Sequence, residues 1–198
     1  MVDDLTRLAI AARDGDRAAL EVFVRRAQAD VHRTCRYLVS RDHADDLTQD
    51  TFLRALRALP AFRADSGART WLLSIAQRTC VDHLRRRQRQ TRLFDRLGNR
   101  RADPAFDGTP DHASSIVLEA VLSELDTDRR AAFVLTQIIG LSYDQAADVL
   151  GCPIGTIRSR VSRAREQLAR TVSDGDAATA ARTVSDGDAA AAGGASPL

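Results

Sequence analysis

Lysine is absent from this sequence of 198 residues, and arginine fills all 29 of its Lys and Arg positions. Arginine suits bidentate contacts with phosphate and guanine, although the same bias also fits an unusual genomic base composition. Long apolar runs are absent too, because no stretch of about 18 residues has the composition of a membrane span. The start of the chain carries Asp3 and Asp4 where a signal peptide needs positive charge. We therefore expect a soluble, cytoplasmic protein with no membrane partner.

Cysteines are few, and their placement argues against two classes of site. Cys35, Cys80 and Cys152 are odd in number and show no paired C-x-x-C spacing, so neither a disulfide framework nor a zinc site is expected. His32 and Cys35 form one H-x-x-C pair, but no second pair accompanies it. We expect no metal and no cofactor. No nucleophile and base combination or paired-carboxylate site emerges, which argues against a nuclease or another enzyme.

Charge is distributed unevenly along the chain. Residues 54–101 hold 13 arginines and 3 acids, residues 102–128 hold 7 acids and no base, and residues 129–170 hold 7 arginines and 3 acids. Two basic blocks separated by an acidic stretch predict two surfaces that bind polyanions.

Apolar residues recur at helical spacing almost throughout, and no convincing strand with period two is present, so the predicted fold class is all-α. Prolines, glycines and aspartates between residues 99 and 113 predict an acidic flexible linker. After residue 170 the sequence ARTVSDGDAA, which starts at 169, starts again at 181, which predicts a disordered tail. The expected helices lie at about 3–14, 16–40, 43–59 and 67–91 in a first domain (1–98), and at about 114–124, 127–139, 142–150 and 154–170 in a second domain (114–170) that precedes the tail (171–198).

The segment 142–161, SYDQAADVLGCPIGTIRSRV, has the spacing of a helix-turn-helix. Ser142 is suited to cap the first helix, Ala147 is small where two helices meet, and Gly151 allows the positive φ of a sharp turn. An apolar stripe on the second helix leaves polar residues on the outer face, where major-groove recognition needs them. The stripe is Ile157, Val161, Ala164 and Leu168, and the outward residues are Arg158, Ser159, Ser162 and Arg163. The alternative is an ordinary helical hairpin with a solvated arginine face.

Two helices of the first domain carry further surface patterns. The helix at 44–59 is expected to bury Phe52, Ala55, Leu56 and Leu59, with a ladder of Asp46, Asp50 and Arg54 opposite and Leu47 and Leu53 beside it. Apolar side chains that border a polar ridge suit a partner-binding face, although scattered exposed leucines are common.

The next helix combines an aromatic residue with interleaved arginines, as single-stranded DNA binding requires. A lone tryptophan is also commonly a core residue, so both interpretations of Trp71 stay open. One face carries Trp71, Ser74, Arg78, Asp82, Arg85 and Arg89, and the opposite face carries Leu72, Leu73, Ala76, Cys80 and Leu84.

These motifs resemble those of the extracytoplasmic-function (ECF) sigma factors of bacterial RNA polymerase, and within them an actinobacterial SigC-like subgroup. The sequence DDLTQDTFLRALRAL (45–59) resembles conserved region 2.2, AFRADSGARTWLLSIAQRTCVDHLRRR (61–87) resembles regions 2.3 and 2.4, and LSYDQAADVLGCPIGTIRSRVSRAREQL (141–168) resembles region 4. The resemblance covers roughly residues 8–170. It implies a sigma factor that binds core polymerase, recognises the minus-ten and minus-thirty-five promoter elements and promotes melting of duplex DNA.

The resemblance also implies which residues contact each partner. The beta-prime clamp helices would meet Asp46, Leu47, Gln49, Asp50, Leu53 and Arg54, and the beta flap of the polymerase is a further expected contact. The opened minus-ten DNA would meet Phe62, Arg63, Ser66, Trp71, Arg78, Asp82, Arg85 and Arg86. The minus-thirty-five duplex would meet Thr156, Arg158, Ser159, Arg160, Ser162 and Arg163. An anti-sigma factor is a further expected partner. Arg78 stands where many relatives carry asparagine, and this departure leaves the identity of the preferred minus-ten base open.

The main rival is a stand-alone repressor or activator that dimerises through its first domain and binds operator DNA through the helix-turn-helix. The basic face around Trp71 favours the sigma factor, whereas tight binding to a palindrome without polymerase would favour the regulator.

Overall fold

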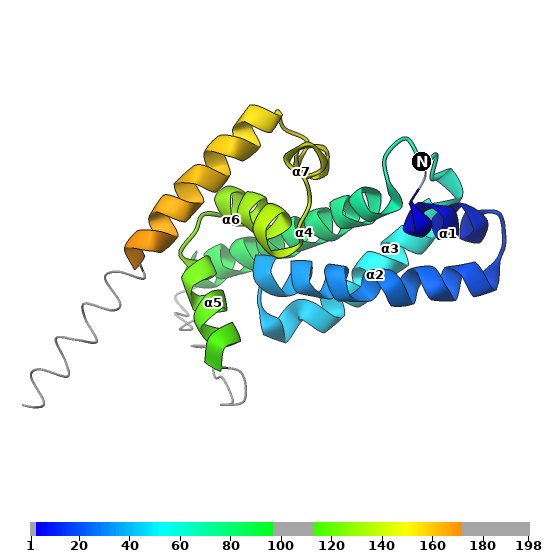
Figure 1. The fold of residues 1–198 in the computed structure, drawn as a ribbon. Coiled ribbons are helices and arrows are strands. Elements are labelled where there is room, and N and C mark those ends of the chain that lie inside the picture. Colours follow the sequence, from blue (N-terminus) through cyan, green and yellow to red (C-terminus); the bar gives the residue numbers. More distant parts are fainter. Residues whose placement is uncertain (1–2, 97–112, 172–198) are drawn as a thin grey trace, which may run out of the picture.

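The computed structural model describes residues 3–96 and 113–171 (Figure 1). Within these two stretches every regular element is a helix and none is a strand, which confirms the all-α class. None of the described helices is both long enough and apolar enough to cross a membrane. The predicted linker and tail lie almost entirely outside the described residues, and the domain boundaries stay predictions.

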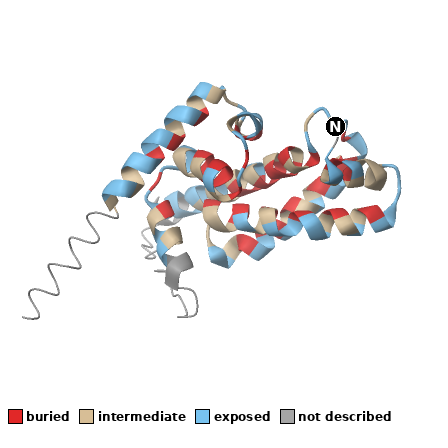
Figure 2. Cartoon of the chain, viewed as in Figure 1, coloured by how far each residue is buried: buried red, intermediate tan, exposed pale blue. Residues whose placement is uncertain are grey.

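The first half is a bundle in which the long helix α2 packs against its neighbours α1, α3 and α4. Figure 2 shows buried residues concentrated where these helices face one another. The elements are α1 (Asp4–Arg13), α2 (Arg17–Leu38), the 3₁₀ turn η1 (Arg41–His43), α3 (Ala44–Ala58), the 3₁₀ turn η2 (Leu59–Ala61) and α4 (Ala68–Arg96).

Local chemistry accounts for several of these helix ends. Asp3 caps α1 by accepting a hydrogen bond from the Thr6 amide, and Asp16 caps α2 in the same way with the Ala19 amide. The helix α3 stops where Pro60 enters the following 3₁₀ turn, because proline lacks the amide hydrogen that a continuing helix needs.

The buried face of α3 differs from the predicted one. Leu56, expected in the core, is 41% exposed, whereas Leu47, expected beside the polar ridge, is only 6% exposed. Thr48 and Thr51 are buried because each hydroxyl donates to a backbone carbonyl one turn earlier in the helix, at 2.7 Å. The inward face therefore contains threonines, and the prediction of this helix's orientation was wrong by part of a turn.

The second half contains a shorter set of helices. They are α5 (Ala113–Ser123), α6 (Thr127–Phe133), the π-helical segment η4 (Val134–Ile138), α7 (Tyr143–Leu150) and a last helix over residues 154–171. The predicted helix at 127–139 is thus an α-helix that continues as a π-helix, a change of repeat that the apolar pattern did not indicate.

The turn between α7 and the last helix has the predicted chemistry. Ser142 and Gln145 form a reciprocal capping box at the start of α7. Gly151 ends α7 with φ of 61°, a conformation that glycine adopts without steric cost. Ile157, Val161 and Ala164 are fully buried on the inner side of the last helix.

The two halves contact each other through α7, which packs on α4 (Figure 1). Arginine side chains make further contacts between the halves. Arg69 of α4 donates to the carbonyl oxygen of Ile139 at 2.7 Å and also pairs with Asp30 of α2. On the other side Arg36 of α2 forms an ion pair with Glu119 of α5.

Candidate nucleic-acid interface

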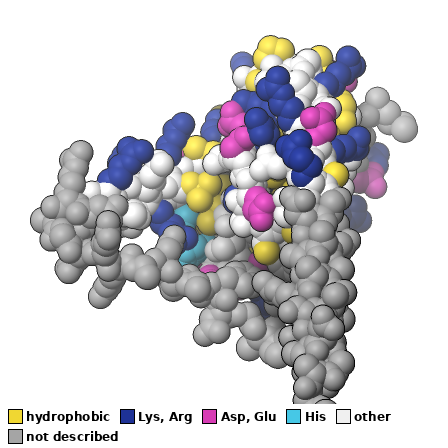
Figure 3. Space-filling view, turned by 90° about the vertical axis from the view of Figure 1, so that its left-hand side faces the viewer, with side chains coloured by type: hydrophobic (Ala, Val, Ile, Leu, Met, Phe, Trp, Pro, Cys, Tyr) yellow, Lys and Arg dark blue, Asp and Glu magenta, His cyan; other side chains and the backbone are white. Residues whose placement is uncertain are grey.

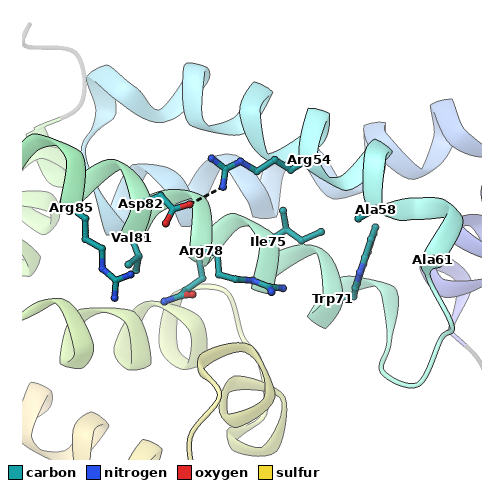
Figure 4. Close-up of a pocket in the computed structure, with 10 residues that line it drawn as sticks. Arg54, Ala58, Ala61, Trp71, Ile75, Arg78, Val81, Asp82 and Arg85 are labelled. Carbon is teal, nitrogen blue, oxygen red and sulfur yellow. Dashed lines mark hydrogen bonds and ion pairs between the residues drawn. The ribbon is translucent and has the colours of Figure 1, made fainter.

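The predicted polar face of α4 exists, and it borders a groove of about 730 Å³ (Figure 4). Arg78, Arg85 and Arg89 are exposed, Trp71 and Asp82 are partly buried, and the opposite side of the helix is in the core. The groove, called the α4 groove below, is lined by Arg54, Ala58, Ala61, Trp71, Ile75, Gln77, Arg78, Val81, Asp82 and Arg85.

Sequence reasoning missed half of these lining residues. Ala58 and Ala61 come from the end of α3 and the turn after it, and no pattern within α4 indicates them. Gln77 and Val81 lie beside the predicted stripe on α4, one helical turn apart, so a wider stripe would have included them.

The ring of Trp71 packs against the ring of Phe62. The two ring centroids are 4.9 Å apart with the planes inclined by 44°, a tilted aromatic contact. Phe62 is 4% exposed, so its ring is part of the core. A direct contact between this ring and a bound base, which the resemblance implied, does not fit such burial.

The loop over residues 63–67 lies between Phe62 and the start of α4. Arg63 and Asp65 form an ion pair at 3.3 Å, and their side chains are 83% and 75% exposed. Ala64 has φ of 59°, a left-handed conformation that is uncommon for a residue with a Cβ atom. Ser66 is half-buried. The loop thus carries exposed polar side chains and leads into the first turn of α4, which contains Trp71.

Arginine side chains on α4 differ in how firmly they are held. Arg78 donates from Nε to the Ser74 carbonyl at 3.0 Å and from Nη2 to the Ser74 hydroxyl at 2.9 Å, so its guanidinium follows its own helix. Arg85 and Arg86 are exposed about two helical turns further along α4. An exposed guanidinium can meet phosphate with little loss of other contacts.

Arg54 connects the α4 groove to helix α3. Its Nη1 lies 2.9 Å from Asp82 Oδ2 across the two helices, and its Nη2 lies 3.0 Å from Asp50 Oδ2 one turn earlier on α3. The hydrogen bond to Asp82, followed by the one to Asp50, raises the pKa of Arg54. The guanidinium is therefore charged and shared between two carboxylates, as the dashed line in Figure 4 shows for Asp82.

The outer surface of α3 carries most of the predicted polymerase-contacting residues. Asp46, Gln49 and Leu53 are exposed, and Asp50 and Arg54 are partly buried. These five residues are called the docking ridge below. Leu47 does not belong to it, because its side chain points into the core. A shallow groove of about 400 Å³ beside the ridge adds residues that the sequence did not indicate, among them Val24, Gln28 and His32 of α2.

The last helix places its predicted outward residues in solvent. Arg158, Ser159, Ser162 and Arg163 are all exposed, whereas Thr156 is partly buried. Figure 3, which views the molecule from the side of this helix, shows arginine side chains gathered over that end with acidic side chains among them. The exposed set is what a recognition helix needs to reach base edges.

Arg160 differs from its neighbours on the last helix. Its guanidinium forms an ion pair with Asp128 of α6 and lies 3.6 Å from the sulfur of Cys152. It therefore fixes the helix-turn-helix to α6, and a contact with DNA would require this pair to open.

The described residues contain no group of three or more potential metal ligands. His32 Nε2 lies 3.2 Å from Asp45 Oδ1, whereas Cys35 is buried and interacts with Cys80. The H-x-x-C pair is therefore split between two different environments.

Comparison with known proteins agrees with this arrangement. The family model for sigma-70 region 2 matches residues 23–90, and the model for sigma-70 region 4 matches residues 115–168. The first match contains the docking ridge and the α4 groove, and the second contains the helix-turn-helix.

Similar proteins are named as sigma factors. The chain is 47% identical over 171 residues to the ECF RNA polymerase sigma factor SigC of Mycobacterium tuberculosis, covering 83% of this chain and 89% of that protein. It is 31% identical over 186 residues to the ECF RNA polymerase sigma-E factor of Haemophilus influenzae, covering 87% and 98%.

Two solved structures have the same fold. One is CnrH in complex with the cytosolic domain of CnrY, with a TM-score of 0.69, 29% identity and coverage of 86% of this chain and 99% of that one. The other is the sigma factor RpoE in complex with the anti-sigma factor NepR from Bartonella quintana, with a TM-score of 0.64, 31% identity and coverage of 78% and 96%. With both sigma-70 regions matched in order and a relative 47% identical over most of the chain, the protein belongs to the ECF sigma factors of RNA polymerase.

Proposed function

We propose that this sigma factor docks on core polymerase through the α3 docking ridge and holds promoter DNA at two places, with the α4 groove on the minus-ten element and the last helix on the minus-thirty-five element. The observation that carries the proposal is the presence of two separate helical faces with exposed arginines, one in each half of the molecule. Each face suits a phosphate backbone, and two faces on one protein suit two sites on one DNA.

Polymerase docking would use Asp46, Gln49, Asp50, Leu53 and Arg54. Leu53 is 47% exposed, and an apolar side chain among charged ones is typical of a protein interface. We propose the beta-prime clamp helices as the partner of this ridge and the beta flap as a partner of the second domain.

Minus-ten recognition would use the α4 groove and the 63–67 loop. The partly buried Trp71 ring offers one surface on which a base of the opened strand can stack, and the exposed Arg78, Arg85 and Arg86 further along α4 would meet phosphates along the same strand. Arg63 and Ser66 of the loop would contact a base extracted from the duplex, at a cost of a few kcal/mol that the new contacts offset. Phe62 would act through Trp71.

Minus-thirty-five recognition would use Arg158, Ser159, Ser162 and Arg163 of the last helix in the major groove, with Thr156 near the phosphate backbone. Arginine reads guanine through two parallel hydrogen bonds, so exposed arginines near the N-terminus of the helix determine sequence preference. Arg160 would orient the helix through Asp128.

The protein would have no covalent chemistry of its own and would act in the cytoplasm, where core polymerase and promoter DNA are found. An anti-sigma factor is a fitting regulator, since the structures of CnrH with CnrY and of RpoE with NepR show complexes of related proteins.

Run-off transcription with purified core polymerase and a promoter library tests the proposal. The full chain should confer initiation at a defined subset of templates that share two elements at a fixed separation. Absence of start-site selection would refute the proposal, and tight binding to a palindromic site without polymerase would instead support a stand-alone regulator.

A further inference from the structure

Helix α1 holds the 63–67 loop at both of its ends. At the first end, Arg13 donates from Nη1 to the carbonyl oxygen of Phe62 at 3.0 Å. At the second end, the hydroxyl oxygen of Thr6 accepts a hydrogen bond from the amide of Ala68 at 2.8 Å. These contacts join residues that are 49 and 62 positions apart in the sequence, so they are tertiary contacts and not part of any local turn.

The Thr6 hydroxyl is itself oriented. It donates to Asp3 Oδ2 at 2.6 Å, which leaves its lone pairs free to accept from Ala68. Thr6 is 4% exposed, so water does not compete for these bonds. Asp3 therefore aims the hydroxyl, and the hydroxyl fixes the first amide of α4.

The loop itself is poorly suited to holding its own shape. The ion pair between Arg63 and Asp65 is highly exposed, and such pairs contribute little to stability. Ala64 is in a left-handed conformation that surrounding contacts must maintain. A Cβ atom built on Gly67 would lie 3.4 Å from Asp3 Oδ2, which shows how closely the start of α1 approaches the loop.

We propose that Thr6 and Arg13 are positioning residues for selection of the minus-ten base, although neither faces the α4 groove. The inference rests on the proposed function, in which the 63–67 loop contacts an extracted base. A polar loop discriminates between bases only when its donors and acceptors are fixed to within a fraction of an ångström. Loosening either end of the loop should reduce discrimination between bases more than it reduces binding of DNA as a whole.

Four variants separate this role from a purely structural one. Thr6→Val keeps the shape of the side chain and removes the hydroxyl, whereas Thr6→Ser keeps the hydroxyl and should behave like the wild type. Arg13→Gln removes the hydrogen bond to the Phe62 carbonyl at the first end of the loop, and Arg13 is more exposed than Thr6. Arg7→Gln changes an exposed arginine on the same helix, whose partner is Asp4, and is the matched control.

The main measurement is run-off transcription with core polymerase on a promoter set that changes one minus-ten or one minus-thirty-five base at a time. In Thr6→Val and Arg13→Gln, discrimination at one minus-ten position should fall about fivefold, the effect expected for one hydrogen bond, with discrimination at minus-thirty-five unchanged. An equal loss of activity on every template, with the preferences intact, would show that α1 only stabilises the fold and would overturn the proposal.

A second measurement uses the free chain and needs no polymerase. Trp71 is the only tryptophan in the sequence, and Phe62, which Arg13 holds, packs against it. Quenching of its fluorescence by acrylamide should increase in Thr6→Val and Arg13→Gln but not in Thr6→Ser or Arg7→Gln. Unchanged quenching in both test variants would overturn the positioning role of Thr6 and Arg13, whether or not the wild type is active with polymerase. Inactivity of the wild type with polymerase would count against the proposed function alone.

Discussion

Arg54 of α3 and Asp82 of α4 form an ion pair across the edge of the α4 groove, with 2.9 Å between Nη1 and Oδ2. Without it, the Asp82 carboxylate would face a surface that is otherwise positive and is proposed to bind phosphates. The pair thus joins two helices and also removes a negative charge from the DNA-binding face.

The first prediction concerns this pair. Arg54→Gln should weaken binding of a single-stranded minus-ten oligonucleotide, because an unpaired carboxylate at 82 repels phosphate. The second change Asp82→Asn in the same chain should restore much of the lost affinity. Fluorescence anisotropy with a labelled oligonucleotide measures both effects, and additive losses in the double variant would contradict the explanation.

The second prediction concerns the docking ridge. Asp50→Arg should reduce association with core polymerase, since it reverses charge at the centre of the ridge, and should leave the helical circular dichroism signal intact. The control Asp148→Arg makes the same charge change at an exposed position on α7. Equal recovery of both variants in a pull-down with core polymerase would remove the ridge from the polymerase interface.

The third prediction separates base recognition from phosphate binding on the last helix. Arg158→Ala should weaken the binding free energy for the preferred minus-thirty-five duplex by about 1–3 kcal/mol, through the loss of contacts at one base pair. Binding to a duplex in which that base pair is changed should weaken little. Arg160→Ala should instead lower the melting temperature slightly, because it removes the mostly buried arginine side chain that links the last helix to α6 and to Cys152. Binding measured on matched and scrambled duplexes decides the first point, and an equal loss on both would show that Arg158 contacts only phosphate.

The fourth prediction concerns pH. Burial of the ring lowers the pKa of His83, and the charges of His43, Arg87 and Arg86 lower it further. The unfolded chain, with an ordinary histidine pKa of about 6.5, then takes up a proton more readily than the folded one. Protonation of His83 therefore favours the unfolded state. The free energy of unfolding should be unaffected by this histidine at a pH well above the unfolded pKa, and it should decrease as the pH falls through the unfolded pKa toward the lower pKa of the folded protein.

His83→Gln provides the test, because glutamine keeps a polar side chain without the titration. The melting temperature of the wild type should fall more than that of the variant between pH 7.5 and pH 5. Parallel curves for the two proteins would mean that other groups cause the acid sensitivity.

The sequence predicted the features that depend on local chemistry. The helix cap at Ser142 and the left-handed Gly151 are determined by residues within a few positions of each other, and both were found where expected, while the reciprocal bond from Gln145 adds to the predicted cap. The polar stripe around Trp71 was found because helical periodicity alone determines which residues of α4 share a face.

What the sequence could not predict depends on contacts between distant segments. Thr48 and Thr51 look polar in the sequence, yet they are buried because their hydroxyls are hydrogen-bonded within α3. The predicted buried face of that helix was therefore wrong by part of a turn. The support of Trp71 by Phe62, and the hold of Arg13 on the Phe62 carbonyl, require the packed bundle and have no signature in the linear pattern.

The π-helical segment Val134–Ile138 has a consequence for mutagenesis of the chain. A π turn contains about one residue more than an α turn, so loss of a single residue there would restore a regular α repeat. Because the π turn accommodates that residue within one turn, the residues that follow would keep nearly the same direction around the helix axis. An in-frame deletion of one codon in this stretch should therefore be tolerated better than one in α6, where loss of a residue from the α repeat would turn everything after it by about 100°.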